Sequence, residues 1–187
     1  AETAIRTYAR SLGYEIKDMA PRSIIFTVDC HPTSQAKIDT LIETINQIKG
    51  FGYPVLVSSH LPLPAPVIEL ADYYIYDKKD ITSGDDKPIY WRKKLDGTTE
   101  TTPSSIPCHA LAWLHNIRNA IDFCIGKYDW IYHIGYDTEV DLKEWLDKVI
   151  SSSKPMIATR WEEREDTFGC QLIAGKTSLM DKIIPHL

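Results

Sequence analysis

The chain has 187 residues, of which 43% are apolar and 25% charged, and its net charge at pH 7 is −5. This composition is typical of a globular protein, and the acidic balance excludes the basic surface needed for sequence-independent nucleic-acid binding. No apolar run approaches the roughly 18 residues that a membrane span requires, and residues 1–20 lack the apolar segment of a signal peptide.

Four scattered cysteines, without metal-site or redox spacing, indicate reduced and packed thiols in a reducing compartment, so we expect a cytoplasmic protein. Residues 2–12 predict a short helix that Gly13 ends. We interpret residues 1–21 as an N-terminal appendage or linker, and residues 22–187 as one domain.

Strands and helices alternate along the predicted domain. The expected strands are short apolar, β-branched or aromatic runs, at residues 23–28, 53–57, 73–76, 130–134, 155–159 and 168–174. The expected helices have apolar residues at helical spacing, and they run from a cap at Thr33 or Ser34 to Gly50, over 67–71, over 107–125, from a cap at Asp141 through Val149, and over 177–184. This alternation favours an α/β fold with a mostly parallel sheet, in which strands 53–57, 23–28 and 130–134 are parallel neighbours.

A polar stretch over residues 78–105 has little periodicity and contains Gly84, Pro88, Gly97 and Pro103. A loop of that length inside a domain is usually a lid, a binding loop or disordered. Its basic residues would face an anionic ligand or belong to an ordinary solvated loop, and both interpretations stay open; they are Lys87, Arg92, Lys93 and Lys94.

Polar residues gather at the predicted carboxyl ends of the strands, where parallel sheets bind ligands. They are Asp29, His31, Ser58, Ser59, His60, Asp77, Asp137 and Glu139. Each alone would be an ordinary surface residue, but their joint placement predicts a site. His133, inside its strand, is predicted to be a hydrogen-bonded core residue.

The focal stretch is the buried strand at 130–134 and the acidic turn after Gly135. Asp137 and Glu139 are two residues apart, which in extended backbone points both carboxylates to one side. They could share a hard cation such as Mg²⁺ or Mn²⁺, or form a solvated acidic turn. The glycine-rich dinucleotide, P-loop and nucleophile-elbow motifs are absent from the sequence.

Several of these segments, in this order, resemble the nucleotide-sugar-binding domain of GT-A-type glycosyltransferases. Ile24–Asp29 resembles the opening strand of that family, and Arg118-Asn119 is similar to its Ala-Arg-Asn-x-Gly helix, with Ile117 and Ile121 in place of the alanine and glycine. Asp137-Thr138-Glu139 occupies the place of the Asp-x-Asp motif. Residues 168–174 resemble the following strand, and residues 55–60 and 71–77 resemble glycosyltransferase-like domains of large viral and bacterial polysaccharide proteins.

The resemblance implies a GT-A-like (Rossmann-like) three-layer α/β/α sandwich that transfers a hexose-like sugar from a nucleotide-diphosphate donor to a carbohydrate hydroxyl. It implies Mn²⁺ or Mg²⁺ held by Asp137 and Glu139. The donor would contact Thr27, Val28, Asp29, Asp77, Arg118 and Asp137. The acceptor's base would be a carboxylate among Glu162, Glu163, Glu165 and Asp166.

Two other functions stay open. One is a non-catalytic sugar- or nucleotide-binding module within a larger polysaccharide-related or virion protein, whose other domains would be its partners. The other is a nucleotidyltransferase, although the expected glycine- and lysine-rich loop does not follow the first strand.

Overall fold

The structure, a computed structural model, describes residues 23–77, 89–93, 99–103, 109–138, 140–160 and 168–184. Its centre is a six-stranded sheet in the order β3-β2-β1-β6-β8-β7. The strands are β1 (Ile24–Cys30), β2 (Val55–Ser59), β3 (Tyr73–Tyr76), β6 (Trp130–Gly135), β7 (Met156–Arg160) and β8 (Phe168–Lys176). Strands β3, β2, β1 and β6 are parallel, and β8 is antiparallel to both β6 and β7. The prediction that β2, β1 and β6 are parallel neighbours is confirmed.

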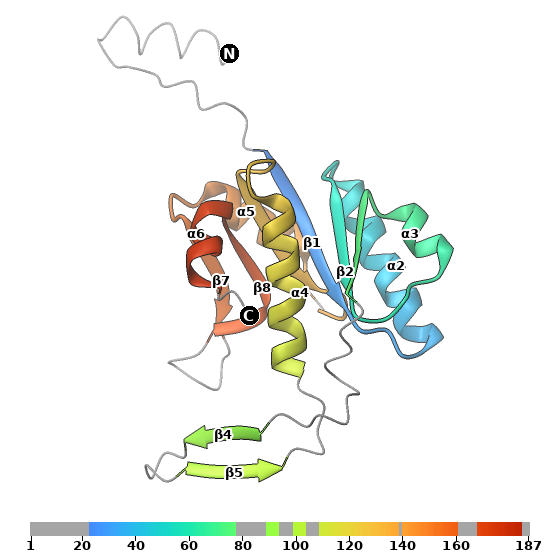
Figure 1. The fold of residues 1–187 in the computed structure, drawn as a ribbon. Coiled ribbons are helices and arrows are strands. Elements are labelled where there is room, and N and C mark those ends of the chain that lie inside the picture. The colour runs from blue at the N-terminus through green and yellow to red at the C-terminus, as the bar shows by residue number, and fades with distance from the viewer. Residues whose placement is uncertain are drawn as a thin grey trace, which may run out of the picture.

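Helices cover both faces of the sheet, as Figure 1 shows. They are α2 (Gln35–Gly50), α3 (Ala65–Leu70), α4 (His109–Cys124), α5 (Leu142–Ser151) and α6 (Thr177–Ile183). Helices α2 and α5 pack on one face, and α4 and α6 pack on the other. The predicted caps are confirmed, because Ser34 accepts a hydrogen bond from the Lys37 amide and Asp141 from the Glu144 amide.

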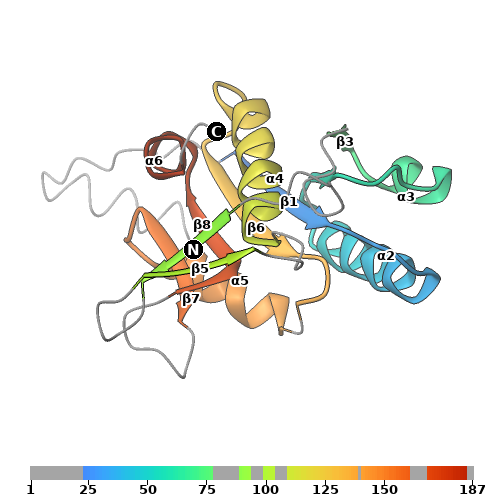
Figure 2. The same cartoon turned by 60° about the horizontal axis from the view of Figure 1, so that its bottom comes forward.

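The prediction of a long irregular loop over residues 78–105 is wrong in part. Strands β4 (Ile89–Lys93) and β5 (Thr99–Pro103) pair antiparallel in a second, two-stranded sheet (Figure 2). Both segments contain β-branched or aromatic residues, which favour strands, but the surrounding glycines, prolines and charges obscured that signal. The parts of this stretch at 78–88, 94–98 and 104–105 lie outside the described residues.

The two faces of the sheet follow from the alternation of side chains along each strand. The face under α2 and α5, here called the α2 face, takes Phe26, Val28, Val55, Val57 and Tyr132 into one core. The opposite face, here called the α4 face, takes Ile25, Leu56, Ile131 and Ile173 into a second core with α4 and α6. A mostly parallel sheet needs apolar cover on both sides.

The buried thiols agree with the expectation of packed, reduced cysteines. Cys30 and Cys124 are free and buried, and burial raises the pKa of both thiols. The side chains of Cys108 and Cys170 lie outside the described part of the chain.

Candidate functional site at the carboxyl ends of β1 and β6

The order of the strands places a topological switch point between β1 and β6. From β1 the chain adds β2 and then β3 toward one edge, and it later returns to place β6 on the other side of β1. The connections therefore leave β1 and β6 in opposite directions, and the carboxyl ends of the strands at such a switch point are where α/β proteins bind ligands. Asp29 lies near the end of β1, and Gly135 ends β6 and begins the predicted acidic turn.

Three side-chain oxygens converge on Gly135 from different directions. A Cβ atom on this glycine would lie 3.1 Å from Thr138 Oγ1, 3.6 Å from Asp137 Oδ1 and 3.8 Å from Asp29 Oδ1. The missing side chain of Gly135 thus leaves room for two carboxylates and a hydroxyl, here called the oxygen cluster. Asp29 Oδ1 and Thr138 Oγ1 are buried and accept or donate no hydrogen bond within the described residues.

The turn that carries Asp137 is held by backbone and side-chain hydrogen bonds. The Tyr136 amide donates to the Asp29 carbonyl at 3.2 Å, and the Thr138 amide donates to the Gly135 carbonyl at 3.1 Å. From α2, the Thr44 hydroxyl donates to the Tyr136 carbonyl at 3.0 Å. The backbone on either side of Asp137 is therefore held by β1, β6 and α2 together, while the Asp137 side chain is exposed.

The negative charges of Asp29 and Asp137 act on the hydroxyl of Tyr136, whose side chain is buried. Burial, and then the negative charge of Asp137, raises the pKa of the Tyr136 hydroxyl to about 12. Cys30 and Asp29 contribute in the same direction. The carboxylates of Asp137 and Asp29 beside this hydroxyl thus disfavour a further negative charge next to it.

Buried polar side chains lie behind Asp29 on the α4 face. His133 is hydrogen-bonded through Nδ1 to Thr27 Oγ1, at 3.0 Å, and through Nε2 to the indole N–H of Trp113, at 3.0 Å. On β2, the Ser58 hydroxyl donates to Asn116 Oδ1 at 3.2 Å. The prediction that His133 is a hydrogen-bonded core residue is confirmed, since only 1% of its surface is exposed.

Three other residues that were predicted to contact the nucleotide-sugar donor do not belong to the oxygen cluster. The side chain of Val28 is fully buried in the core of the α2 face, so it does not reach the oxygen cluster. Thr27 is also buried, beneath Asp29, and its hydroxyl pairs with His133. Asp77 follows the edge strand β3 and accepts a hydrogen bond from Asn119 of α4 at 3.0 Å. It is therefore separated from Asp29 by the width of β2.

Arg118 is occupied by structural contacts between α4 and α6. Its guanidinium donates to the carboxylates of Asp122 and Asp181 and to the carbonyls of Asp181 and Ile184. These bonds use all five of its N–H donors, and they tie α4 to the end of α6. The predicted contact of Arg118 with a phosphate remains a prediction, and it would require some of these bonds to break.

Several predicted residues lie outside the described residues, and they are Glu139, Glu162, Glu163, Glu165 and Asp166. Among the described residues no group of three or more histidines, cysteines and carboxylates has the arrangement of a metal site.

The sequence interpretation missed Thr138 and Trp113. Thr138 lies inside the Asp-x-Glu motif, and an attentive interpretation of Gly135 as a site of close approach would have pointed to it.

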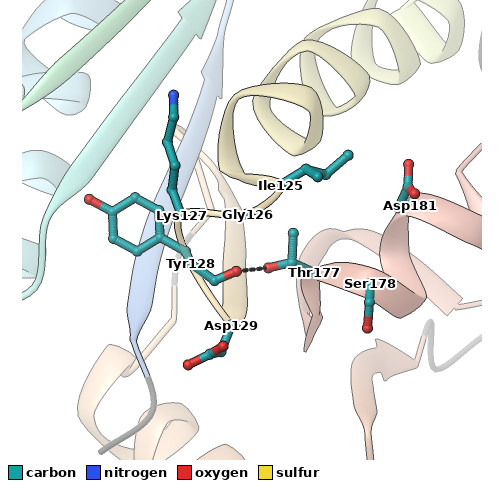
Figure 3. A pocket seen from close by; sticks show the side chains of 8 residues that line it. All are labelled: Ile125, Gly126, Lys127, Tyr128, Asp129, Thr177, Ser178 and Asp181. Carbon is teal, nitrogen blue, oxygen red and sulfur yellow. Dashed lines mark hydrogen bonds between the residues drawn. The ribbon is translucent and has the colours of Figure 1, made fainter.

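An open pocket of about 340 Å³ lies at the other end of the sheet, between the α4–β6 turn and the start of α6 (Figure 3). Thr177 donates a hydrogen bond to the Tyr128 carbonyl across it at 2.7 Å. The charged side chains of Lys127, Asp129 and Asp181 point away from one another in Figure 3 rather than toward a common ligand. Since it lies at the amino ends of the parallel strands, this pocket is not where the fold predicts a ligand.

No helix within the described ranges combines the length and apolar character needed to cross a membrane. No protein-family model matches the chain, and no curated protein matches it significantly.

Proposed function

We propose that the chain is a metal-dependent glycosyltransferase domain of GT-A-like fold, which binds a nucleotide-diphosphate sugar at the switch point. The observation that carries this is the convergence of Asp29, Asp137 and Thr138 over Gly135. The sequence motif predicted acidic ligands in this turn, and the turn lies where a nucleotide-binding sheet places its ligand.

The residues of the oxygen cluster fit Mn²⁺ or Mg²⁺. Both ions prefer oxygen ligands, and they are commonly held by one or two carboxylates while other positions stay open for phosphate oxygens. Asp137 would be the principal protein ligand, with Asp29 or Thr138 close by and Glu139 adjacent in sequence. When bound, the ion would supply Lewis-acid stabilisation of the charge that develops on the leaving nucleoside diphosphate.

The chain's own residues would orient the donor. The hydrogen-bonded turn at 135–138 positions the backbone of Asp137, and Asp29 offers a buried acceptor oxygen for a hydroxyl or N–H of the nucleotide. A carboxylate among Glu163, Glu165 and Asp166 would take the proton of the acceptor hydroxyl if the reaction inverts the anomeric centre.

A non-catalytic nucleotide- or sugar-binding module is the second candidate. The observation that favours it is the engagement of Arg118, because the arginine expected beside the donor phosphates is tied to α6 instead. Hydrolysis of the donor by the purified protein with Mn²⁺ would distinguish an enzyme from a binding module.

The first test is titration calorimetry of nucleotide sugars with and without Mn²⁺, using the wild type and Asp137→Asn. An amide keeps the shape of the side chain but removes the charge that a hard dication needs. We expect Asp137→Asn to weaken the Mn²⁺-dependent affinity by at least about tenfold and to leave the melting temperature unchanged. Unchanged donor affinity with Mn²⁺ still required would move the metal away from this turn.

A second test uses two matched glycine substitutions. In Gly135→Ala the new methyl group enters the oxygen cluster, 3.1 Å from Thr138 Oγ1. In the control Gly175→Ala the methyl group is equally crowded, 3.1 Å from Met180 Cγ, but its neighbours are methionine side chains on β7 and α6. We expect both to lower stability modestly and only Gly135→Ala to abolish Mn²⁺-dependent binding. Equal losses of binding in the two variants would count against the site.

A further inference from the structure

The open pocket of about 340 Å³ at the amino ends of the parallel strands lacks the features of a site for a charged ligand. Its charged side chains do not converge, as Figure 3 shows, and the Thr177 hydroxyl is already bonded to the Tyr128 carbonyl. Ile125, just after the end of α4, points toward α6, and 46% of its surface is exposed. The pocket therefore presents an apolar side chain to solvent, which favours an apolar occupant.

The chain enters β1 at the rim of this pocket. Ser23 is the first residue that the structure describes, and its amide donates to Asp129 Oδ2 at 3.1 Å while its hydroxyl donates to the Lys127 carbonyl at 3.3 Å. In return, the Asp129 and Trp130 amides donate to the Ser23 carbonyl at 2.9 and 3.1 Å. Lys127 and Asp129 both line the pocket. Residues 1–22 are therefore joined to the fold beside it.

The segment before Ser23 has the sequence of an amphipathic helix. In the helix predicted over residues 2–12, Ile5, Tyr8 and Leu12 recur at helical spacing and fall on one face. An isolated helix of this length is marginal in water, because most helical stability in proteins comes from packing of the apolar face. The predicted helix therefore needs a surface that covers these three side chains.

We propose that residues 2–12 dock their apolar face into this pocket, with Ile125 as the central contact on the pocket side. Two carboxylates and one lysine, those of Asp129, Asp181 and Lys127, line the pocket, and this acidic balance complements Arg6 and Arg10 of the segment. The docking does not involve the switch point, so it goes beyond the proposed glycosyl transfer and does not depend on it.

The connection between the predicted helix and the pocket suits this docking. Residues 13–22 can span at most about 33–36 Å, and Ser23 is bonded to two residues that line the pocket, so the helix can fold back without strain. A short connection gives an effective concentration in the millimolar range. Even a weak apolar contact is then largely formed, and a separate partner has to compete with it.

Hydrogen exchange of the full chain, followed by mass spectrometry, tests the docking. We expect the amides of residues 5–12 to exchange about tenfold more slowly than in a synthetic peptide of residues 1–22, the ratio for an effective concentration about ten times the dissociation constant. Exchange as fast as in the free peptide would overturn the proposal.

Matched substitutions locate the contact on the pocket. We expect Ile125→Ser to remove the protection of residues 5–12 and Ile150→Ser to keep it. Ile150 is the control because it is equally exposed, at 48%, and lies on α5, which covers the other face of the sheet. Far-UV circular dichroism checks that both variants fold. Protection that survives Ile125→Ser would place the segment elsewhere and overturn the proposal.

A second pair of variants leaves the pocket unchanged. Ile5→Ser alters the predicted apolar face of the segment and Arg10→Ser alters its other side, so we expect only Ile5→Ser to remove the protection. Equal effects of the two substitutions would overturn the proposed orientation of the helix. Protection that rises with protein concentration would mean that the segment of a second copy fills the pocket, and this would overturn docking within one chain.

Discussion

The two faces of the central sheet are built differently. The α2 face is mostly apolar along the strands, apart from Ser59 at the end of β2, and Phe26, Tyr132 and Trp145 pack edge to face on it. On the α4 face, strands β1, β2 and β6 are apolar at their amino ends, at Ile25, Leu56 and Ile131, and polar farther along.

On the α4 face, polar side chains occupy every second position toward the carboxyl ends of these strands. They are Thr27 and Asp29 on β1, Ser58 on β2 with His60 directly after it, and His133 on β6. A buried polar side chain must find a hydrogen-bond partner to offset the cost of its desolvation, so a face that carries several of them toward one edge is not optimised for packing alone. The contrast indicates that the α2 face stabilises the domain and the α4 face serves the switch point.

The largest effect should come from the α2 face. Phe26 is fully buried and its ring contacts those of Tyr53 and Tyr132. We expect Phe26→Ala to reduce the free energy of unfolding by about 3–5 kcal/mol, because it removes the buried ring and leaves a cavity. Denaturant unfolding would measure this, with the exposed Phe51→Ala as control. A loss of less than about 1 kcal/mol would mean that this core is loosely packed.

The polar part of the α4 face should show a smaller and non-additive effect. Ser58→Ala removes the hydroxyl that donates to Asn116 and leaves a buried amide oxygen unpaired, so we expect a loss of about 1–3 kcal/mol. The double variant Ser58→Ala with Asn116→Leu removes both polar partners and should recover part of that loss. Strictly additive losses in this cycle would show that the two side chains are energetically independent.

The apolar part of the α4 face should exclude water as the α2 face does, and Cys124 reports on it. Burial raises the pKa of its thiol from 9.0 to about 12, an effect that Lys127 partly offsets. The unfolded chain therefore loses this proton above pH 9, whereas the folded chain keeps it until about pH 12. The stability from this group is complete below pH 9 and falls as the pH rises toward 12.

The measurement compares the unfolding free energies of the wild type and Cys124→Ala at pH 8 and pH 10. The wild type should lose about 1 kcal/mol more than the variant over this interval. Parallel losses in the two proteins would indicate that solvent reaches the thiol and that this end of the α4 face is open.

Local signals in the sequence were sufficient for most of the secondary structure. The caps Ser34 and Asp141, and Gly126 with its φ of 73°, act within one turn of the chain, so their effect is visible without the fold. The buried stripe of α5, at Leu142, Trp145, Leu146 and Val149, follows from helical spacing alone. The same holds for the parallel arrangement of β2, β1 and β6, which the strand–helix alternation favours.

The pairing of β4 with β5 could not be obtained in this way, because it depends on contacts between segments whose own pattern is weak. The environment of Arg118 is a similar case. Its position on α4 was predicted, but the partner carboxylate and carbonyls on α6 lie more than sixty residues away in sequence. The packing of α4 against α6 therefore decides which N–H donors of Arg118 remain for a ligand.

The sequence by itself determined the α/β alternation, the carboxylates at the strand ends and the acidic turn after β6, since each depends on neighbouring residues and on the period of a strand or helix. Only the tertiary structure decided that Asp29, Asp137 and Thr138 converge on Gly135, and that His133 lies between Asp29 and Trp113. The physical reason is the strand order, because β1 and β6 become neighbours across more than a hundred residues of sequence. That pairing brings together side chains that are far apart in the sequence, so no local pattern predicts the distances between them.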